Sequence, residues 1–391
     1  ADRFKMRQMS KIYLDYAATT PINSRVFAAM EPHLKERLGN PGSLHSFGQE
    51  AIAAVDASRE TVAKSIGADF REVVFTGSAT EANNLALRGI ARSGSRVIVS
   101  SIEHESILET AQALEKNGID VVYLPVDMGG VVDLDKLKSS LNKKTVLVSV
   151  MYANNETGTI QPIEEISRII KDFDNKILFH TDAVQAFQFL DCDVKKLGAD
   201  LMTLSAHKIY GPKGIGILYV SKTAKKILQP IITGGGQEYG MRSGTENVAS
   251  IVGFAKAVEL VVGSRAMPAG RQELESERIR ELRDYFWSEL KKIHPSVELN
   301  GSLENSLPNI LNIYFPGHKS EDILIGLDMA GIAVSSGSAC SMRSSKLSHV
   351  LRAFGLLVER IQGSVRFSFG RPTSKEEIEK AIDTIRKIIK N

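Results

Sequence analysis

The feature that most constrains the fold is an alternation, from about residue 70 onward, of short β-branched runs with longer helical stretches. Strands that alternate with helices form parallel sheets covered by helices, and several of these runs are apolar throughout, as strands buried on both faces are. The chain is therefore predicted to be an α/β protein with a mostly parallel sheet wrapped by helices. The predicted strands lie at 72–76, 96–100, 121–124, 145–150, 177–180, 200–204 and 215–220.

The last third of the chain predicts a smaller domain of mixed strands and helices. A helical pattern from about 249 to 293 is broken at 263–270, where glycine and proline indicate a turn. Short strands are expected near 309–315 and 364–369. We expect the following division: a large domain at 24–262, a small α+β domain at 10–23 and 263–391, and a cloning remnant or disordered extension at 1–9.

The final helix has the clearest start signal in the chain. Ser374 and Glu377 have the spacing of a capping box, in which each side chain satisfies a backbone N–H of the first turn. Isoleucines then recur on one face at helical spacing. An amphipathic helix is expected to begin at Ser374.

Composition excludes several classes of function. The 391 residues contain 49 Lys and Arg against 46 Asp and Glu, and the two signs are interspersed, which argues against nucleic acid as a direct partner. There is no run of about 18 apolar residues and no signal peptide pattern. We expect a cytoplasmic protein with no membrane contact. The two cysteines, Cys192 and Cys340, exclude a disulfide framework and a cysteine-rich metal site, and no metal is expected.

Small residues lead from the first predicted strand into a helix. Gly77, Ser78, Ala79 and Thr80 precede Glu81, which suits a helix N-terminus with free backbone N–H groups. Such a terminus can bind a phosphate because its dipole favours negative charge. Ser and Gly also cap helices without any ligand, so the pattern by itself leaves both interpretations open.

Two further polar groups follow buried strands, where open α/β sheets bind ligands. Asp182 follows the run at 177–180, and Lys208 follows the run at 200–204. A partly desolvated lysine forms Schiff bases with carbonyls, and an aspartate can pair with a pyridinium nitrogen; together they match pyridoxal phosphate chemistry. Taken singly, Asp182 could cap a helix and Lys208 could be a solvated loop residue.

The chain resembles the cysteine desulfurases of the NifS and IscS type, which are class V members of the aspartate-aminotransferase-like, fold type I pyridoxal-phosphate enzymes. The resemblance runs from residue 13 to Arg371. Four motifs carry it: Tyr-Leu-Asp-Tyr-Ala-Ala-Thr-Thr-Pro at 13–21, Ser-Ala-His-Lys at 205–208, Gly-Met-Arg-Ser-Gly-Thr at 240–245 and Ser-Ser-Gly-Ser-Ala-Cys at 335–340.

The resemblance implies a role for each matching residue. Lys208 would hold pyridoxal 5'-phosphate covalently, Asp182 would pair with its ring nitrogen, and His104 would stack on the ring. Gln185 and Asn155 would lie at the phenolic oxygen, and Asn155 also near the substrate. The resemblance further implies the phosphate ligands Ala79, Thr80, Ser205 and His207, with Thr245 from a second protomer of a homodimer.

Arg366 matches the arginine that binds the substrate carboxylate, for which a planar guanidinium is well shaped. Three of these residues also have ordinary structural interpretations. His104 could cap a helix, Arg366 could form a surface ion pair, and Asn155 could form a turn.

Cys340 is the candidate nucleophile. It lies in a run of Ser, Gly and Ala, whereas Cys192 stands between two aspartates that disfavour a thiolate and is expected to be structural. The implied reaction converts L-cysteine to L-alanine and leaves the sulfur on Cys340 as a persulfide, with Lys208 moving the Cα proton and His104 the thiol proton.

Alternative functions differ in what they require. A selenocysteine lyase or an aminotransferase of the same class would not need Cys340, and a sulfur-relay scaffold would act mainly by docking an acceptor. The sequence ends at Asn391, close behind the final helix, whereas IscS-type members have a further tail that helps dock the iron–sulfur scaffold. We therefore expect a NifS-like enzyme that passes sulfur to a protein acceptor, such as an iron–sulfur scaffold.

Overall fold

The computed structural model describes residues 11–266, 271–337 and 347–389. The chain divides into two compact units. The small unit comprises Ala1–Ala18, Asn155–Gly158 and Gln272–Asn391, and the large unit comprises Thr19–Asn154 and Thr159–Arg271.

This division differs from the expected boundaries at both ends of the large domain and inside it. Residues 19–23, 263–266 and 271 belong to the large unit and not to the small domain, and the large domain was expected to include residues 155–158, which belong to the small unit. Three hydrogen bonds hold this segment in the small unit. The Leu307 N–H donates to the Gly158 carbonyl at 2.9 Å, and Asn312 Nδ2 donates to the Glu156 carbonyl at 3.2 Å. Arg366 donates to the Asn155 carbonyl at 2.9 Å. These pairings are between residues far apart in sequence, so no local pattern indicates them.

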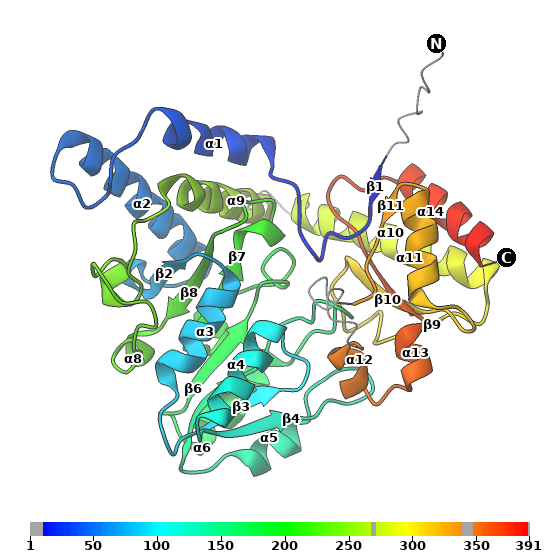
Figure 1. Ribbon diagram of the computed structural model, residues 1–391, viewed down its shortest axis with the longest axis horizontal. Coiled ribbons are helices and arrows are strands. Elements are labelled where there is room, and N and C mark those ends of the chain that lie inside the picture. The colour runs from blue at the N-terminus through cyan, green and yellow to red at the C-terminus, as the bar shows by residue number, and fades with distance from the viewer. Residues whose placement is uncertain (1–10, 267–270, 338–346, 390–391) are drawn as a thin grey trace. The chain divides into compact units, whose positions relative to one another are not determined.

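The large unit contains the predicted seven-stranded sheet, and the α/β prediction is confirmed (Figure 1). The strand order is β2-β8-β7-β6-β5-β3-β4. Every neighbouring pair is parallel except the two that involve β8. The strands are β2 (Val73–Thr76), β3 (Arg96–Ser100), β4 (Asp120–Leu124), β5 (Thr145–Ser149), β6 (Leu178–Asp182), β7 (Leu201–Ser205) and β8 (Gly216–Val220).

Helices follow the strands of the large unit as the alternating pattern predicts. Among them, α3 and α4 pack against one another and bury apolar side chains such as Leu85, Ile107 and Ala111 with sheet residues Val99 and Leu147 (Figure 1). The helices are α1 (Ser24–Lys35), α2 (Ser46–Ser65), α3 (Ala79–Ile90), α4 (Glu105–Lys116), α5 (Leu134–Ser140), α6 (Ile163–Phe173), α7 (Val194–Leu197), α8 (Lys222–Lys225) and α9 (Val248–Ala266), with 3-10 turns η1 (Phe70–Glu72), η2 (Ala206–Lys208) and η3 (Glu238–Gly240).

The small unit contains two short sheets. The parallel pair is β1 (Ile12–Tyr13) with β11 (Ile332–Ala333), and the antiparallel sheet has the order β12-β10-β9, formed by β12 (Ser364–Ser368), β10 (Ile310–Tyr314) and β9 (Glu298–Leu299). Phe286 packs on Phe367 and Phe369, with ring centroids 4.8 Å and 5.6 Å away. The helices are α10 (Arg271–Ile293), α11 (Ser320–Met329), α12 (His349–Ala353), α13 (Val358–Gln362) and α14 (Lys375–Ile388).

The start of α14 is as predicted. Ser374 accepts from the Glu377 N–H and Glu377 accepts from the Ser374 N–H, which completes the capping box. Ile378, Ile382 and Ile385 are buried on its inner face. The small α+β domain therefore ends on the amphipathic helix that the sequence indicates.

Gly216 allows the start of α3 to approach the sheet closely at the end of β2 and β7. A Cβ atom on Gly216, the first residue of β8, would lie 2.8 Å from the Ser78 carbonyl carbon and 2.9 Å from the Ala79 nitrogen. Only glycine allows this approach, because real Cβ atoms do not come so near backbone atoms. In the ladder Gly216 pairs with Thr76 of β2 and with Ser205 of β7. The N-terminus of α3 thus lies at the edge where β2 and β7 end.

Within the described residues, no helix combines the length and the apolar character needed to cross a membrane.

Candidate active site

Asp182 is a buried carboxylate at the end of β6. It is 5% exposed, and its Oδ1 accepts from the Val184 N–H at 3.0 Å. Its Oδ2 accepts from Asn83 Nδ2 at 2.8 Å. Within the part of the chain that the structure describes, Asp182 forms no salt bridge. A buried carboxylate is costly without a positive partner, so this position is suited to a ligand that carries an N–H or a positive charge.

His104 caps helix α4 and is fixed in one orientation. Its Nδ1 accepts from the Ser106 N–H at 3.1 Å and lies 2.8 Å from Ser106 Oγ. Because Nδ1 is the acceptor, the proton of the neutral ring is on Nε2. The capping interpretation of His104 is therefore correct, and it is compatible with a role at the ring, since capping uses only one of the two nitrogens.

Asp182 and His104 are joined through two residues that the sequence analysis did not single out. Asn83 Nδ2 donates both to Asp182 Oδ2 and to Ser106 Oγ, each at 2.8 Å. Ser106 in turn contacts His104 Nδ1. Asn83 is fully buried on α3 among apolar neighbours. The sequence did contain a signal for Asn83. This residue stands on the apolar face of a predicted helix, and a buried amide there requires hydrogen-bond partners.

Glu103 holds the turn that leads to His104. Its Oε1 accepts from Ser100 Oγ at 2.7 Å and from the Met151 N–H at 2.6 Å. Burial raises the pKa of Glu103 to about 8, with Asp182 adding to the rise. The carboxyl therefore largely keeps its proton at neutral pH and adds little charge beside Asp182. Sequence reasoning missed this residue, since nothing local indicates that a Glu is buried.

Lys208 lies on η2, directly beyond β7. Thr20, from the motif at 13–21, holds this loop through hydrogen bonds. The His207 carbonyl accepts from both the N–H and the Oγ1 of Thr20, each at 2.9 Å. Thr20 Oγ1 also accepts from the Tyr210 N–H at 2.8 Å. Tyr210 has a positive φ of 65°, which costs free energy and is maintained by these contacts. Thr20 thus holds the two residues that flank Lys208 and Ile209.

His207 is neutral at physiological pH. Burial, with the charges of Lys208 and Lys213, lowers the pKa of His207 to about 3. Its Nδ1 lies 3.1 Å from Thr19 Oγ1. A neutral imidazole in this position can donate a hydrogen bond to an anion without adding a charge.

The turn that the sequence predicts to bind a phosphate, residues 77–80, lies at the N-terminus of α3, and we call it the phosphate turn. Ser78 is the N-cap and accepts from the Glu81 N–H at 3.1 Å. Ala79 and Thr80 follow it, half-buried and exposed respectively. The Glu81 carboxylate does not bind Ser78 as a capping box would; it accepts from the Gly77 N–H at 2.8 Å.

The remaining large-unit candidates lie in three different settings. Ser205 is buried at the end of β7, where it pairs with Gly216. Gln185 is buried three residues beyond Asp182. Thr245 is exposed on the segment between η3 and α9.

The small unit brings Arg366 and Asn155 together. Arg366 is 1% exposed on β12; its Nη2 donates to Asp15 Oδ1 at 2.7 Å and its Nη1 to the Asn155 carbonyl at 2.9 Å. Its Nε has no hydrogen-bond partner among the described residues. Arg366 does form an ion pair, with Asp15, but the pair is buried, so the interpretation is wrong only in placing it at the surface. Asp15, missed by the sequence analysis, belongs to the first motif.

Cys340 lies outside the described residues, but the positions that flank its segment are described. Ser335 exchanges two backbone hydrogen bonds with Arg366, at 2.6 Å and 3.2 Å. Ser348 Oγ donates to Glu156 Oε2 at 2.6 Å. Cys192 is fully buried, as expected of a structural cysteine. Among the described residues, no group of His, Cys, Asp and Glu is arranged to hold a metal ion.

Comparison with known proteins assigns the chain to a family. The family model of aminotransferase class V matches residues 12–381. The chain belongs to the class V aminotransferase family. The family's match covers the residues that form both groups of candidate side chains, Asp182, His104 and Lys208 in the large unit and Arg366 in the small unit.

Named relatives within the family are consistent with one another. The chain is 48% identical to "Cysteine desulfurase IscS" of Dictyoglomus turgidum, over 97% of this chain and 94% of that protein. It is 45% identical to "Putative cysteine desulfurase IscS 1" of Bacillus subtilis, over 98% and 99%. Among solved structures, a "NIFS-LIKE PROTEIN" matches with a TM-score of 0.89 and 37% identity, over 97% of this chain and 99% of that one. The structure "SspA in complex with cysteine" matches with a TM-score of 0.79 and 35% identity, over 92% and 99%.

Proposed function

We propose that this protein is a pyridoxal-phosphate-dependent cysteine desulfurase, which converts L-cysteine to L-alanine and transfers the sulfur to Cys340 as a persulfide. The observation that carries the proposal is the match, over nearly the whole chain, to proteins named cysteine desulfurase. The two groups of side chains described above fit this chemistry. The acceptor of the sulfur is a protein, such as an iron–sulfur scaffold, and the enzyme works in the cytoplasm.

Pyridoxal 5'-phosphate fits the large-unit residues. Asp182 is a buried carboxylate with no salt bridge among the described residues, which is the partner that a protonated pyridine nitrogen requires. Lys208 would hold the cofactor, His104 would lie against the ring and Gln185, with Asn155, at the phenolic oxygen. When bound, the cofactor supplies an electron sink for the substrate's Cα. Its phosphate would be held by Ala79, Thr80, Ser205, His207 and, from a second protomer, Thr245.

The substrate carboxylate would bind Arg366. A guanidinium has five N–H donors, of which Asp15 and the Asn155 carbonyl use one each. Those two contacts hold the plane of the group, while Nε remains without a partner among the described residues. The remaining donors can bind a carboxylate in a bidentate manner.

Proton transfers would be carried out by Lys208 and His104. The Lys208 amine takes the substrate's Cα proton and later returns it. His104 holds a proton at Nε2, because Nδ1 is used by Ser106. Nε2 is therefore the atom through which His104 can serve the substrate's sulfur.

Sulfur transfer would use the Cys340 thiolate. The thiolate attacks the substrate sulfur and forms an S–S bond, while the substrate's C–S bond breaks and its electron pair stays on the carbon product. That product gains a proton and leaves as L-alanine, so the persulfide sulfur on Cys340 is oxidised and the Cβ carbon is reduced. No external oxidant is required.

The test is to incubate the purified protein with L-cysteine and a reductant, and to measure alanine, sulfide and the mass of Cys340. Cys340→Ser should keep the cofactor's absorbance and its response to cysteine but fail to form persulfide. Lys208→Ala should lose the absorbance of the covalently held cofactor. Unchanged alanine and sulfide production in Cys340→Ser would contradict the role of Cys340. Absence of alanine and sulfide from the cofactor-loaded protein would favour a selenocysteine lyase or an aminotransferase.

A further inference from the structure

The segment between β8 and α9 contains a strained turn. Glu238 and Tyr239 both have left-handed backbone conformations, with φ of 49° and 60°. Such conformations are unfavourable for non-glycine residues and persist only where surrounding contacts enforce them. Six residues after Tyr239 comes Thr245, the residue proposed to bind a phosphate. We call residues 237–245 the threonine loop.

A buried ion pair holds the beginning of the threonine loop. Arg59 of α2 donates to both carboxylate oxygens of Glu238, at 2.6 Å and 2.8 Å, and the two side chains are 5% and 2% exposed. Glu238 Oε2 also accepts from the Phe75 N–H of β2 at 3.0 Å. The Arg59 guanidinium lies over the rings of Phe75 and Tyr239, at 4.9 Å and 5.2 Å from their centroids.

A second carboxylate holds the loop nearer to Thr245. Arg242 Nε donates to Glu81 Oε1 at 2.8 Å, and these side chains are 23% and 16% exposed. The other oxygen of Glu81 accepts from the Gly77 N–H at 2.8 Å. Glu81 therefore binds the loop through Arg242 and the phosphate turn through Gly77.

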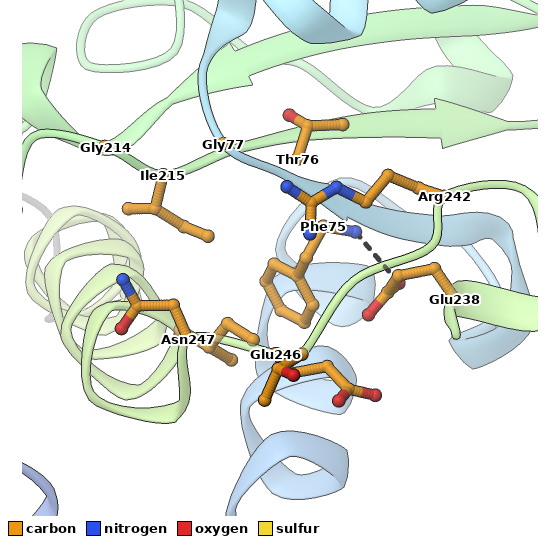
Figure 2. A pocket seen from close by; sticks show the side chains of 11 residues that line it. Phe75, Thr76, Gly77, Gly214, Ile215, Glu238, Arg242, Glu246 and Asn247 are labelled. Carbon is orange, nitrogen blue, oxygen red and sulfur yellow. Dashed lines mark hydrogen bonds between the residues drawn. The ribbon is translucent and has the colours of Figure 1, made fainter. Parts of the chain in front are cut away.

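The two carboxylates act in the same way. Each accepts one backbone N–H from the segment 75–77, which runs from the end of β2 toward α3, and each accepts from one arginine. Glu238 belongs to the loop itself, whereas Glu81 accepts from the loop's Arg242. Between the loop and this segment lies a cavity of about 140 Å³, lined by Gly77, Arg242 and Thr245 among others. Figure 2 shows Arg242, Glu238 and Phe75 around it, with the Phe75–Glu238 hydrogen bond dashed.

We propose that Glu81 and Glu238, with Arg242 and Arg59, are positioning residues that fix the threonine loop to the phosphate turn, so that Thr245 is held ready for the cofactor phosphate of a second protomer. This inference rests on the proposed function. A rigid loop presents the threonine hydroxyl without an ordering cost at the moment of binding. Glu81 therefore connects two roles: the phosphate turn would bind the cofactor of its own protomer, and the loop that Glu81 holds would present Thr245 to the cofactor of the partner protomer.

The first experiment compares two ligands that differ only in the phosphate. The dissociation constants of pyridoxal 5'-phosphate and of pyridoxal are measured by absorbance titration of the apo-protein. Arg242→Gln removes the loop's contact with Glu81 and should weaken pyridoxal phosphate binding about tenfold, while pyridoxal binding stays within about twofold. Arg242→Lys, which keeps the charge, should recover part of the loss.

A matched control uses another glutamate–cation pair. Lys64 pairs with Glu60 on α2 at 2.9 Å, so Lys64→Gln breaks an ion pair far from the loop in sequence. This variant should leave the ratio of the two dissociation constants unchanged. Glu238→Gln should change the ratio in the same direction as Arg242→Gln. If Glu238→Gln does not fold, as judged by its thermal melting, the comparison rests on Arg242, which is partly exposed.

Thr245→Ala separates failure of this inference from failure of the proposed function. If it leaves the ratio unchanged, Thr245 is not a phosphate ligand and that assignment is wrong. If it changes the ratio while Arg242→Gln does not, the positioning inference is overturned. If both act through Thr245, the double variant should lose no more than about the larger single effect, because coupled residues are not additive.

Discussion

Asn83 on α3 donates a hydrogen bond of 2.8 Å to Asp182 Oδ2 at the end of β6. The same nitrogen donates to Ser106 Oγ, which contacts His104 Nδ1. One buried amide therefore orients both the carboxylate proposed to face the cofactor's ring nitrogen and the imidazole proposed to stack on the ring. Residues that hold reacting groups from behind set the geometry on which catalysis depends.

Asn83→Ala should lower kcat about tenfold and weaken cofactor binding, because Asp182 and Ser106 each lose a buried hydrogen bond. The measurements are steady-state alanine formation and titration of the apo-protein with pyridoxal phosphate. Asn84→Ala is the matched control, since Asn84 follows Asn83 but bonds to the Thr80 carbonyl and to Arg88 and Thr110. Equal losses in the two variants would contradict a specific role for Asn83.

Glu103→Gln should change how stability depends on pH. Burial raises the Glu103 pKa from 4.5 to about 8. Below pH 4.5 the carboxyl is protonated in both the folded and the unfolded chain, so it contributes no pH dependence there. Between pH 4.5 and 8 only the unfolded chain releases this proton, so the free energy of unfolding falls as the pH rises.

The glutamine variant keeps an acceptor for Ser100 and Met151 but cannot ionise. Its free energy of unfolding, relative to the wild type, should therefore increase between about pH 5 and 8, by an amount on the order of 3 kcal/mol. Urea titrations at several pH values measure this difference, with Glu105→Gln as the control. Parallel stability curves for wild type and Glu103→Gln would show that Glu103 is ionised in the folded chain.

Asp15→Ala should raise the KM for cysteine about tenfold and leave kcat within about twofold. Asp15 holds Arg366 Nη2 at 2.7 Å, so its loss frees the guanidinium proposed to bind the substrate carboxylate. Glu298→Ala serves as the control, because Glu298 pairs with Arg360 on the same unit. A fall in kcat at unchanged KM would assign Asp15 to a different step.

Gly216→Ala should destabilise the large unit by about 1–3 kcal/mol, because its Cβ would overlap the backbone of Ser78 and Ala79. Gly263→Ala is the matched change on α9, where a Cβ meets nothing within 4 Å. There alanine should stabilise the helix by up to about 1 kcal/mol. Chemical denaturation measures both, and a neutral Gly216→Ala would show that the start of α3 can move away from β8.

Much of the site follows from local pattern. The seven strands, the cap at Ser78 and the helix that begins at Ser374 lie where the sequence predicts them, because strand and helix periodicity and capping are properties of neighbouring residues. Asp182 and Lys208 were identified because the ends of parallel strands share one edge of a sheet. The resemblance to a known family added the remaining roles.

The sequence by itself determined the α/β architecture and indicated the candidate reactive residues. Only the tertiary structure decided what orients them: Asn83 behind Asp182, Thr20 on the Lys208 loop, Asp15 on Arg366, and Glu81 between Gly77 and Arg242. Each of these contacts joins residues distant in the chain, and a polar side chain of the same type is more often solvated than buried. The role of each of these side chains depends on its burial, because burial raises the free-energy cost of leaving a polar group without a hydrogen bond. Burial in turn is decided by the packing of the whole unit.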